Sequence, residues 1–190
     1  GNKKIINEFE KLVYKTLETL PYTSKFNNFK TKVSISTPSK EEDGSLMATE
    51  NFISLITETR NVCIYWEEVE FILNRRVSHI ENSSEIFKNN GRSYFITFTE
   101  CERKDFYSFI DKLKLPYEPQ KNESKFDFFA SLRQVCKGIY QNKKNPQVVQ
   151  DLDLTNLWKK RKITTFSYIY YLNMLSGRSY NDLRQYPIFP

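Results

Sequence analysis

Few of the side chains that carry out chemistry in enzymes are present, and they are widely spaced. The chain has one histidine, His79, and three cysteines, Cys63, Cys101 and Cys136, without C-x-x-C or other metal-ligand spacing. A single histidine excludes a multi-histidine metal site and gives no arguable Ser–His–Asp order for acyl transfer. The five glycines are scattered singly, which excludes a glycine-rich phosphate loop. We therefore expect no enzyme activity, no cofactor and no metal, and reduced thiols as in a cytosolic protein.

Positive charge is the remaining feature that could bind a ligand, and it is unevenly distributed along the chain. Nine of the 29 Lys and Arg but only three of the 23 Asp and Glu lie from Lys137 onward, so the whole excess of +6 falls there. Residues 1–136 are balanced, which argues against a basic nucleic-acid-binding domain. We expect no nucleic-acid partner.

Eight basic residues are candidate contacts to an anionic membrane surface. In residues 38–44, however, Lys40 stands against three acids, which disfavours a phosphoinositide headgroup in that loop. The basic run at 159–162 has a simpler explanation as a solvated helix end, where cations favour the helix dipole. The candidates are Lys32, Lys40, Arg75, Arg76, Lys159, Lys160, Arg161 and Lys162.

The elements that position these residues change in type along the chain. Apolar positions at helical spacing predict a helix over residues 3–20. Residues 32–98 are strand-like, with residues 38–44 as a turn. The expected strands are 33–37, two within 45–59, 62–66, 69–77, 84–91 and 92–98.

A helix is predicted after the last strand. Thr99 and Glu102 fit a capping box, and Phe106, Phe109 and Ile110 lie on one helical face with Leu113. About seven strands closed by such a helix are typical of the pleckstrin-homology (PH) architecture. We therefore predict an α+β chain with a PH-like seven-stranded β-sandwich or barrel, capped by a C-terminal helix, and added helices at the N-terminus and in the C-terminal segment.

The rest of the chain is predicted to be helical, except at its end. Residues 115–153 are interpreted as a linker with one helix, capped within 124–127. A short helix starts near Asp153, and Thr164 or Thr165 caps an apolar helix that ends at Gly177. A short strand is predicted at residues 186–189. The apolar helix must be buried against something, and no apolar run is long enough to span a membrane.

The C-terminal window resembles the opening of a BEACH domain, which begins with a Trp-containing helix followed by an N-F-x-Y-L-M-x-L-N-x-x-A-G-R-S-Y-N-D-L-x-Q-Y-P-V-F-P run. Thr165 and Ser176 depart from this run, where Asn and Ala are usual. The resemblance is to BEACH-domain proteins of the neurobeachin and lysosomal-trafficking-regulator type. The motif positions are Trp158, Leu172, Asn173, Gly177, Arg178, Ser179, Tyr180, Asn181, Asp182, Gln185, Tyr186, Pro187 and Phe189.

This resemblance implies an organisation and a function. The resemblance implies that the BEACH domain follows a PH-like domain whose sequence only weakly resembles ordinary PH domains. We therefore expect an N-terminal helix and lead-in at 1–29, a PH-like domain at 30–114, the linker at 115–153 and the first part of a BEACH domain at 154–190. The motif residues are expected to be structural. The implied partners are the remainder of the BEACH domain and other trafficking proteins, with weak contact to anionic membranes.

Two functional hypotheses lead, and a third, weaker one is an enzyme regulatory module. The first is a non-enzymatic interaction module of a large cytosolic scaffold in vesicle and endolysosomal traffic, with the PH-like and BEACH surfaces forming a partner-binding groove. The chain would then be cytoplasmic, or peripheral on endomembranes. The alternative is a phosphoinositide-binding PH domain that targets membranes.

Overall fold

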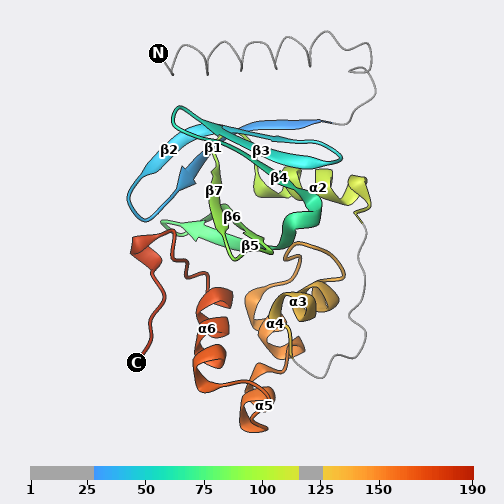
Figure 1. Cartoon of the computed structure of the whole chain (residues 1–190), viewed down its shortest axis with the longest axis vertical. Coiled ribbons are helices and arrows are strands. Elements are labelled where there is room, and N and C mark those ends of the chain that lie inside the picture. Colours follow the sequence, from blue (N-terminus) through green and yellow to red (C-terminus); the bar gives the residue numbers. More distant parts are fainter. Residues whose placement is uncertain (1–27, 116–125) are drawn as a thin grey trace.

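The structure is a computed structural model that describes residues 28–115 and 126–190. Its upper part is a seven-stranded antiparallel sheet in the order β4-β3-β2-β1-β7-β6-β5 (Figure 1). The helix predicted at residues 3–20 lies outside the described residues. The strands are β1 (Phe29–Ser36), β2 (Glu41–Ala48), β3 (Phe52–Thr57), β4 (Asn61–Tyr65), β5 (Val69–Val77), β6 (Ile80–Lys88) and β7 (Ser93–Phe98).

The sheet curls around a core of aliphatic and aromatic side chains. β1 pairs with β2 on one side and with β7 on the other, so it joins a meander of β1–β4 to a meander of β5–β7. Ile53, Ile64, Ile72 and Ile96 are fully buried in this core. Alternation of apolar and polar residues places such side chains on the inner face of each strand.

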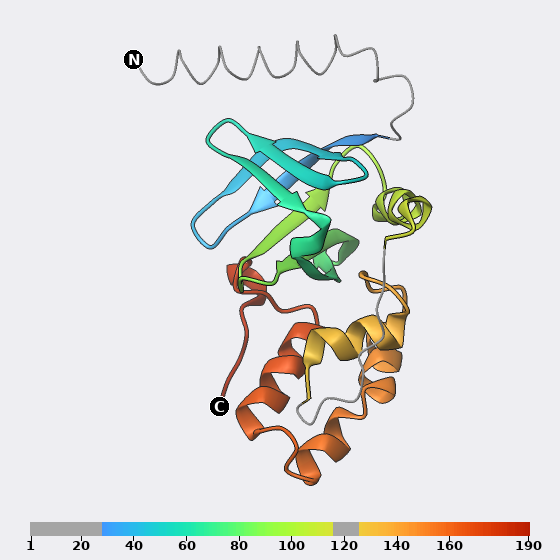
Figure 2. The same ribbon diagram turned by 45° about the vertical axis from the view of Figure 1, so that its right-hand side comes forward.

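Helix α2 (Arg103–Leu113) packs against one side of the curled sheet (Figures 1 and 2). Phe106, Phe109 and Ile110 are buried there, as predicted. The predicted capping box is wrong by three residues, because Glu102 is the N-cap and exchanges bonds with Asp105. The α+β fold class, with seven strands followed by a helix, is confirmed.

Four helices form the lower part of the molecule: α3 (Phe128–Cys136), α4 (Asn145–Asp151), α5 (Leu154–Lys159) and α6 (Thr165–Leu175). Their apolar side chains form a second core with Phe71 and Leu73 of β5, both fully buried. β5 is therefore buried on both faces, since Ile72 points into the sheet's own core. The described part of the predicted linker, residues 126–153, contains two helices, α3 and α4, rather than the one predicted.

Local signals account for most of the helix boundaries. Asp127 caps α3 by accepting a hydrogen bond from the Ala130 amide, and Thr164 caps α6 through the Ser167 amide. Gly177 has φ of 94°, the left-handed conformation expected after a helix end. Among the described residues, no helix is long and apolar enough to cross a membrane.

Two further sequence predictions are wrong. The acidic residues Glu41–Asp43, assigned to a turn, begin β2 and pair with Ser34–Ser36 of β1. Their charge is tolerated because Glu42 bonds Lys40 and Thr59 at the hairpin surface. Residues 186–189 are not a strand; a short 3₁₀ turn, η2 (Leu183–Gln185), precedes an irregular end. Pro187 within this stretch and Pro190 directly after it have no backbone N–H to donate to a strand ladder.

Candidate functional site

A buried carboxylate joins the sheet to the C-terminal segment. Oε2 of Glu85 on β6 accepts from Nε of Arg75 at 2.7 Å. Its Oε1 accepts from the hydroxyls of Ser93 at 2.7 Å and Ser179 at 2.8 Å, and from the Asn181 amide at 3.0 Å. The Arg75 and Glu85 side chains are only 1% and 2% exposed. Both charges are thus paired and further hydrogen-bonded, as burial requires.

Arg75 is the second half of this connection. Its Nη1 donates to the Met174 carbonyl at 2.8 Å, at the end of α6, and its guanidinium lies 5.7 Å from the centre of the Phe87 ring. Nη2 is buried without a hydrogen-bond partner and has the nearby ring as its compensation. The prediction that Arg75 contacts an anionic surface is therefore wrong, because the guanidinium is enclosed.

The C-terminal segment folds back over α6. Nδ2 of Asn173 donates to the Ile188 carbonyl at 2.8 Å, and its Oδ1 accepts from the Ile188 amide at 3.0 Å. Nη1 of Arg178 donates to the Tyr186 carbonyl, and Asp182 accepts from the Arg184 amide. These side chains replace the ladder that a strand would have provided.

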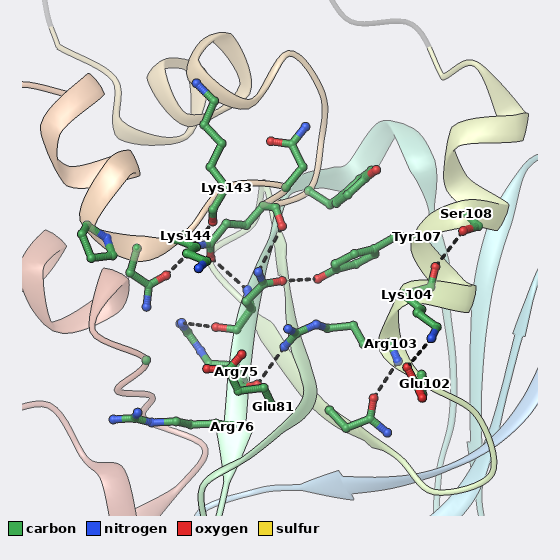
Figure 3. A pocket seen from close by; sticks show the side chains of 18 of the residues that line it. Arg75, Arg76, Glu81, Glu102, Arg103, Lys104, Tyr107, Ser108, Lys143 and Lys144 are labelled. Atoms are coloured by element: carbon green, nitrogen blue, oxygen red, sulfur yellow. Dashed lines mark hydrogen bonds and ion pairs between the residues drawn. The ribbon is translucent and has the colours of Figure 1, made fainter.

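A groove of about 880 Å³ lies between the sheet and the helical part (Figure 3). One wall comes from the β5–β6 hairpin, including Arg76 and Glu81, and a second from the exposed side of α2, including Arg103 and Ser108. Residues 140–146 form the third wall, and Ser176–Gly177 close the lower end. The groove therefore exists only where the PH-like sheet, the connecting loop and the C-terminal segment meet.

Six basic and three acidic residues line the groove, and four of these nine residues are in ion pairs. Lys104 bonds Glu102 at 2.8 Å, and Lys143 bonds Asp151 at 2.8 Å. Arg103 donates to the carbonyls of residues 75 and 83 at 3.0 and 2.8 Å. Such a lining offers hydrogen-bond donors and acceptors of both charge signs to a polar ligand, with an excess of basic groups.

Two tyrosines stack at the side of the groove, with ring centres 4.2 Å apart. Burial raises the pKa of Tyr107 to about 12, and its hydroxyl donates to Oδ1 of Asn74 at 2.7 Å. Burial, and then the hydrogen bond to Asp111, raise the pKa of Tyr140. Both phenols are therefore neutral hydrogen-bonding groups at physiological pH, so the groove is suited to binding.

Most BEACH-motif side chains have structural contacts. Ser179, Asp182, Asn173 and Pro187 are buried, and Gly177 is enclosed at the end of α6. Nε2 of Gln185 donates to the Arg76 carbonyl at 2.7 Å, which ties the 3₁₀ turn to β5. Leu172 is half-buried in the helical core.

The aromatic motif residues are more exposed. Trp158 stacks on Tyr168 with ring centres 5.0 Å apart, and Phe189 stacks on Phe166 at 5.2 Å. Tyr180 and Tyr186 meet edge to face and are more than 40% exposed. These rings form the apolar surface of the C-terminal segment.

The candidate basic contacts do not come together. Lys32 pairs with Glu100 at 2.5 Å and Lys40 with Glu42 at 2.5 Å, both on the sheet. Lys159–Lys162 are exposed beyond α5, at the opposite end of the molecule (Figure 1). Arg76 alone of the eight lines the groove with an exposed side chain.

Sequence reasoning missed Glu85, Ser93 and Asn74, which hold the two parts together. A signal for Glu85 was present, because a carboxylate directly beside the apolar pair Ile86-Phe87 in a predicted strand is expensive unless it is paired. Its partners could not be predicted, since Ser179 is 94 residues away.

Comparisons with known proteins found a family model and curated relatives with similarity to this chain. The Beige/BEACH domain family matches residues 156–190. The chain is 35% identical over 112 residues to the WD repeat- and FYVE domain-containing protein 4 of Mus musculus, and 32% identical over 126 residues to the lysosomal-trafficking regulator of Homo sapiens. These alignments cover 56% and 66% of this chain but only 3% of each relative.

Similarity to solved structures is weaker. A C-terminal domain of an unknown protein from Leishmania infantum aligns with a TM-score of 0.44 and 18% identity, over 57% of this chain and 99% of that one. The linker-DH/PH domains of p115-RhoGEF align with a TM-score of 0.36 and 12% identity, over 53% of this chain and 32% of that one. The family match over residues 156–190 and the two curated relatives support a BEACH-domain protein.

Proposed function

We propose that this chain is a non-enzymatic interaction module of a large cytosolic scaffold in vesicle and endolysosomal membrane traffic. In this proposal the PH-like sheet (residues 30–114) and the first part of the BEACH domain (residues 154–190) act together, and the groove between them binds a segment of a partner protein. Similarity to a lysosomal-trafficking regulator supports the setting. The observation on which this proposal rests is the groove of about 880 Å³.

The size and lining of the groove favour a peptide segment. A volume of about 880 Å³ is at the upper end of typical ligand sites. Its walls carry acidic, basic and neutral polar side chains, for example Glu81, Arg103 and Asn142. These groups can bond the backbone and side chains of an extended polar peptide. The neutral tyrosines and paired lysines described above offer no activated nucleophile, so the same residues favour binding over catalysis.

The groove is rigidly built, and this favours recognition. The buried Arg75–Glu85 pair and the Gln185 bond to residue 76 hold the C-terminal segment on the sheet. A preformed site loses less entropy when it binds a flexible peptide. The alternative, phosphoinositide binding at the β1–β2 hairpin, is disfavoured because Lys32 and Lys40 are each paired with a glutamate.

Peptide display on the purified chain tests the proposal. Random peptides should be enriched, and the selected peptides should lose about tenfold or more in affinity to a Ser108→Trp variant, because the indole would fill the groove from the exposed side of α2. Lys112→Trp places the same side chain on an exposed position of α2 that does not line the groove. Equal loss in both variants, or no enrichment at all, would rule out the groove as the binding site.

A further inference from the structure

A second, smaller pocket of about 450 Å³ adjoins the groove and shares Arg76 and Ser176 with it. Its charged lining includes three arginines, Arg76, Arg178 and Arg184, and no carboxylate of the described residues lines it. The larger groove, by contrast, mixes acids and bases. Of these two pockets, only the smaller one is lined by basic residues without an acidic residue among them.

The pocket is assembled from two distant parts of the chain. Arg76 comes from the end of β5, and the other two arginines come from the segment after α6. The Gln185 side chain, itself part of the lining, donates to the Arg76 carbonyl at 2.7 Å and fixes the two parts together. The arginines therefore converge only when the C-terminal segment is docked on the sheet.

The charge of the pocket suits a dianion. Arg184 pairs with Asp182 at 2.9 Å, and that carboxylate is 2% exposed behind it. Arg178 donates one bond to a neutral carbonyl, and the Arg76 side chain makes no hydrogen bond or ion pair with the described part of the chain. Two uncompensated positive charges therefore face the pocket, which matches the charge of about −1.5 to −2 on a phosphate monoester at neutral pH.

The β5–β6 turn adds polar groups at the rim. Val77 pairs with Ile80, so Ser78 and His79 form a two-residue hairpin loop, with φ of 50° and 70°. Left-handed backbone is costly for residues other than glycine, and Asn-Gly is the usual choice in such turns. Here both positions carry side chains that line the pocket. Strain of this kind is retained where the side chains have a use.

We propose that this pocket binds the phosphoryl group of a phosphorylated serine or threonine in a partner protein, and that the adjoining groove holds the flanking peptide. The inference rests on the proposed partner-binding function and specifies its ligand. Arginine forks match the oxygens of a phosphate in paired, charge-assisted bonds. The adjoining groove is lined by the acidic residues Glu81, Glu102 and Asp111 and by six basic residues, so it can pair with side chains of both signs in a peptide that flanks the phosphate, and its hollow of about 880 Å³ suits a peptide more than a flat lipid surface.

The test uses the purified 190-residue chain and two bead-bound degenerate peptide libraries. One library has phosphoserine fixed at its centre, and the other has serine there. We expect at least about tenfold greater retention on the phosphoserine library, lost in Arg76→Ala and reduced in Arg178→Lys, which keeps the charge but not the fork. Arg92→Ala removes an exposed arginine that lines neither pocket and should change nothing. Circular dichroism confirms that each variant is folded.

Inorganic phosphate and vesicles of phosphatidylcholine containing a phosphoinositide separate the sources of the phosphoryl group. Competition by inorganic phosphate for the phosphoserine library supports the proposal. Equal retention on both libraries overturns the phosphate pocket while leaving the peptide groove intact. Binding of free phosphate alone, or of vesicles alone with dependence on Arg76, overturns the assignment to a phosphorylated partner. If the Ser108→Trp variant retains neither library but still binds inorganic phosphate, the groove binds the peptide and the pocket binds the phosphoryl group, as proposed.

Discussion

The Ser179 hydroxyl donates to Oε1 of Glu85 at 2.8 Å across 94 residues of sequence. The serine belongs to the most recognisable run of the BEACH segment, Gly177 to Leu183, and the glutamate belongs to the PH-like sheet. A residue of the family motif therefore takes part directly in the buried contact that holds the two parts of the chain together. The two parts of the chain are held together by polar bonds that require exact partners, in addition to apolar packing.

Removing this carboxylate should be strongly destabilising. Glu85→Ala leaves the Arg75 guanidinium buried without its ion pair, and we expect a loss of about 3–5 kcal/mol in the free energy of unfolding, measured with urea. Glu81→Ala, an exposed position on the same strand, is the control and should cost little. A double change of Arg75→Met with Glu85→Leu should recover part of the loss. If Glu85→Ala and Glu81→Ala are equal, the pair does not stabilise the fold.

Asp127 should contribute through its cap. Asp127→Ala removes the acceptor for the Ala130 amide at the start of α3 and should cost about 1 kcal/mol in thermal or urea unfolding. Asp127→Asn keeps an acceptor at the same position and should be nearly neutral. Equal costs for the two variants would mean that charge, and not the hydrogen bond, is important here.

Stability should fall at alkaline pH through Tyr107. Its pKa is about 12 when folded, against 10.0 for the free group, so the unfolded chain loses this proton first as the pH rises. The contribution of Tyr107 to the free energy of unfolding is fully present below pH 10. It is lost progressively from pH 10 toward pH 12, by about 2–3 kcal/mol at the upper end. Urea unfolding of the wild type and Tyr107→Phe across this range should show a shallower decline in the variant. Parallel declines would contradict the prediction.

Gly44 should tolerate no side chain. A Cβ at this position of β2 would collide with the Ile56 carbonyl on β3, so Gly44→Ala should lower stability by about 1–3 kcal/mol. Gly138 has open space at the same position and a backbone that other residues adopt, so Gly138→Ala is the matched control and should be close to neutral. Comparable melting temperatures of the two variants would contradict the prediction, because they would mean that β3 shifts to accommodate the added Cβ without loss of stability.

The local part of the fold could be predicted from the sequence. Alternation placed the strands, and the spacing of Phe106, Phe109 and Ile110 placed the buried face of α2. Thr164 and Gly177 marked the ends of α6. Each of these features is decided by residues within a few positions of one another.

The candidate site could not be predicted in this way. Arg75 was expected at the surface because a charged residue in a strand normally faces solvent, but the helices of the lower part cover that face of β5. Arg76 and Gln185 meet across 109 residues, a distance that no local pattern spans. The motif of the C-terminal segment indicated the family, while the surfaces that it shares with the sheet depended on tertiary packing.

The loop before α4 also determines how the protein can be divided. The Ile72 amide donates to the Ile139 carbonyl, and its carbonyl accepts from the Gln141 amide, so this loop adds a short parallel bridge to the outer edge of β5. A fragment that ended at residue 115 would uncover this edge together with Phe71 and Leu73. An open strand edge beside apolar side chains is a template for self-association. We therefore expect a fragment that ends at residue 115 to self-associate more readily than the whole chain.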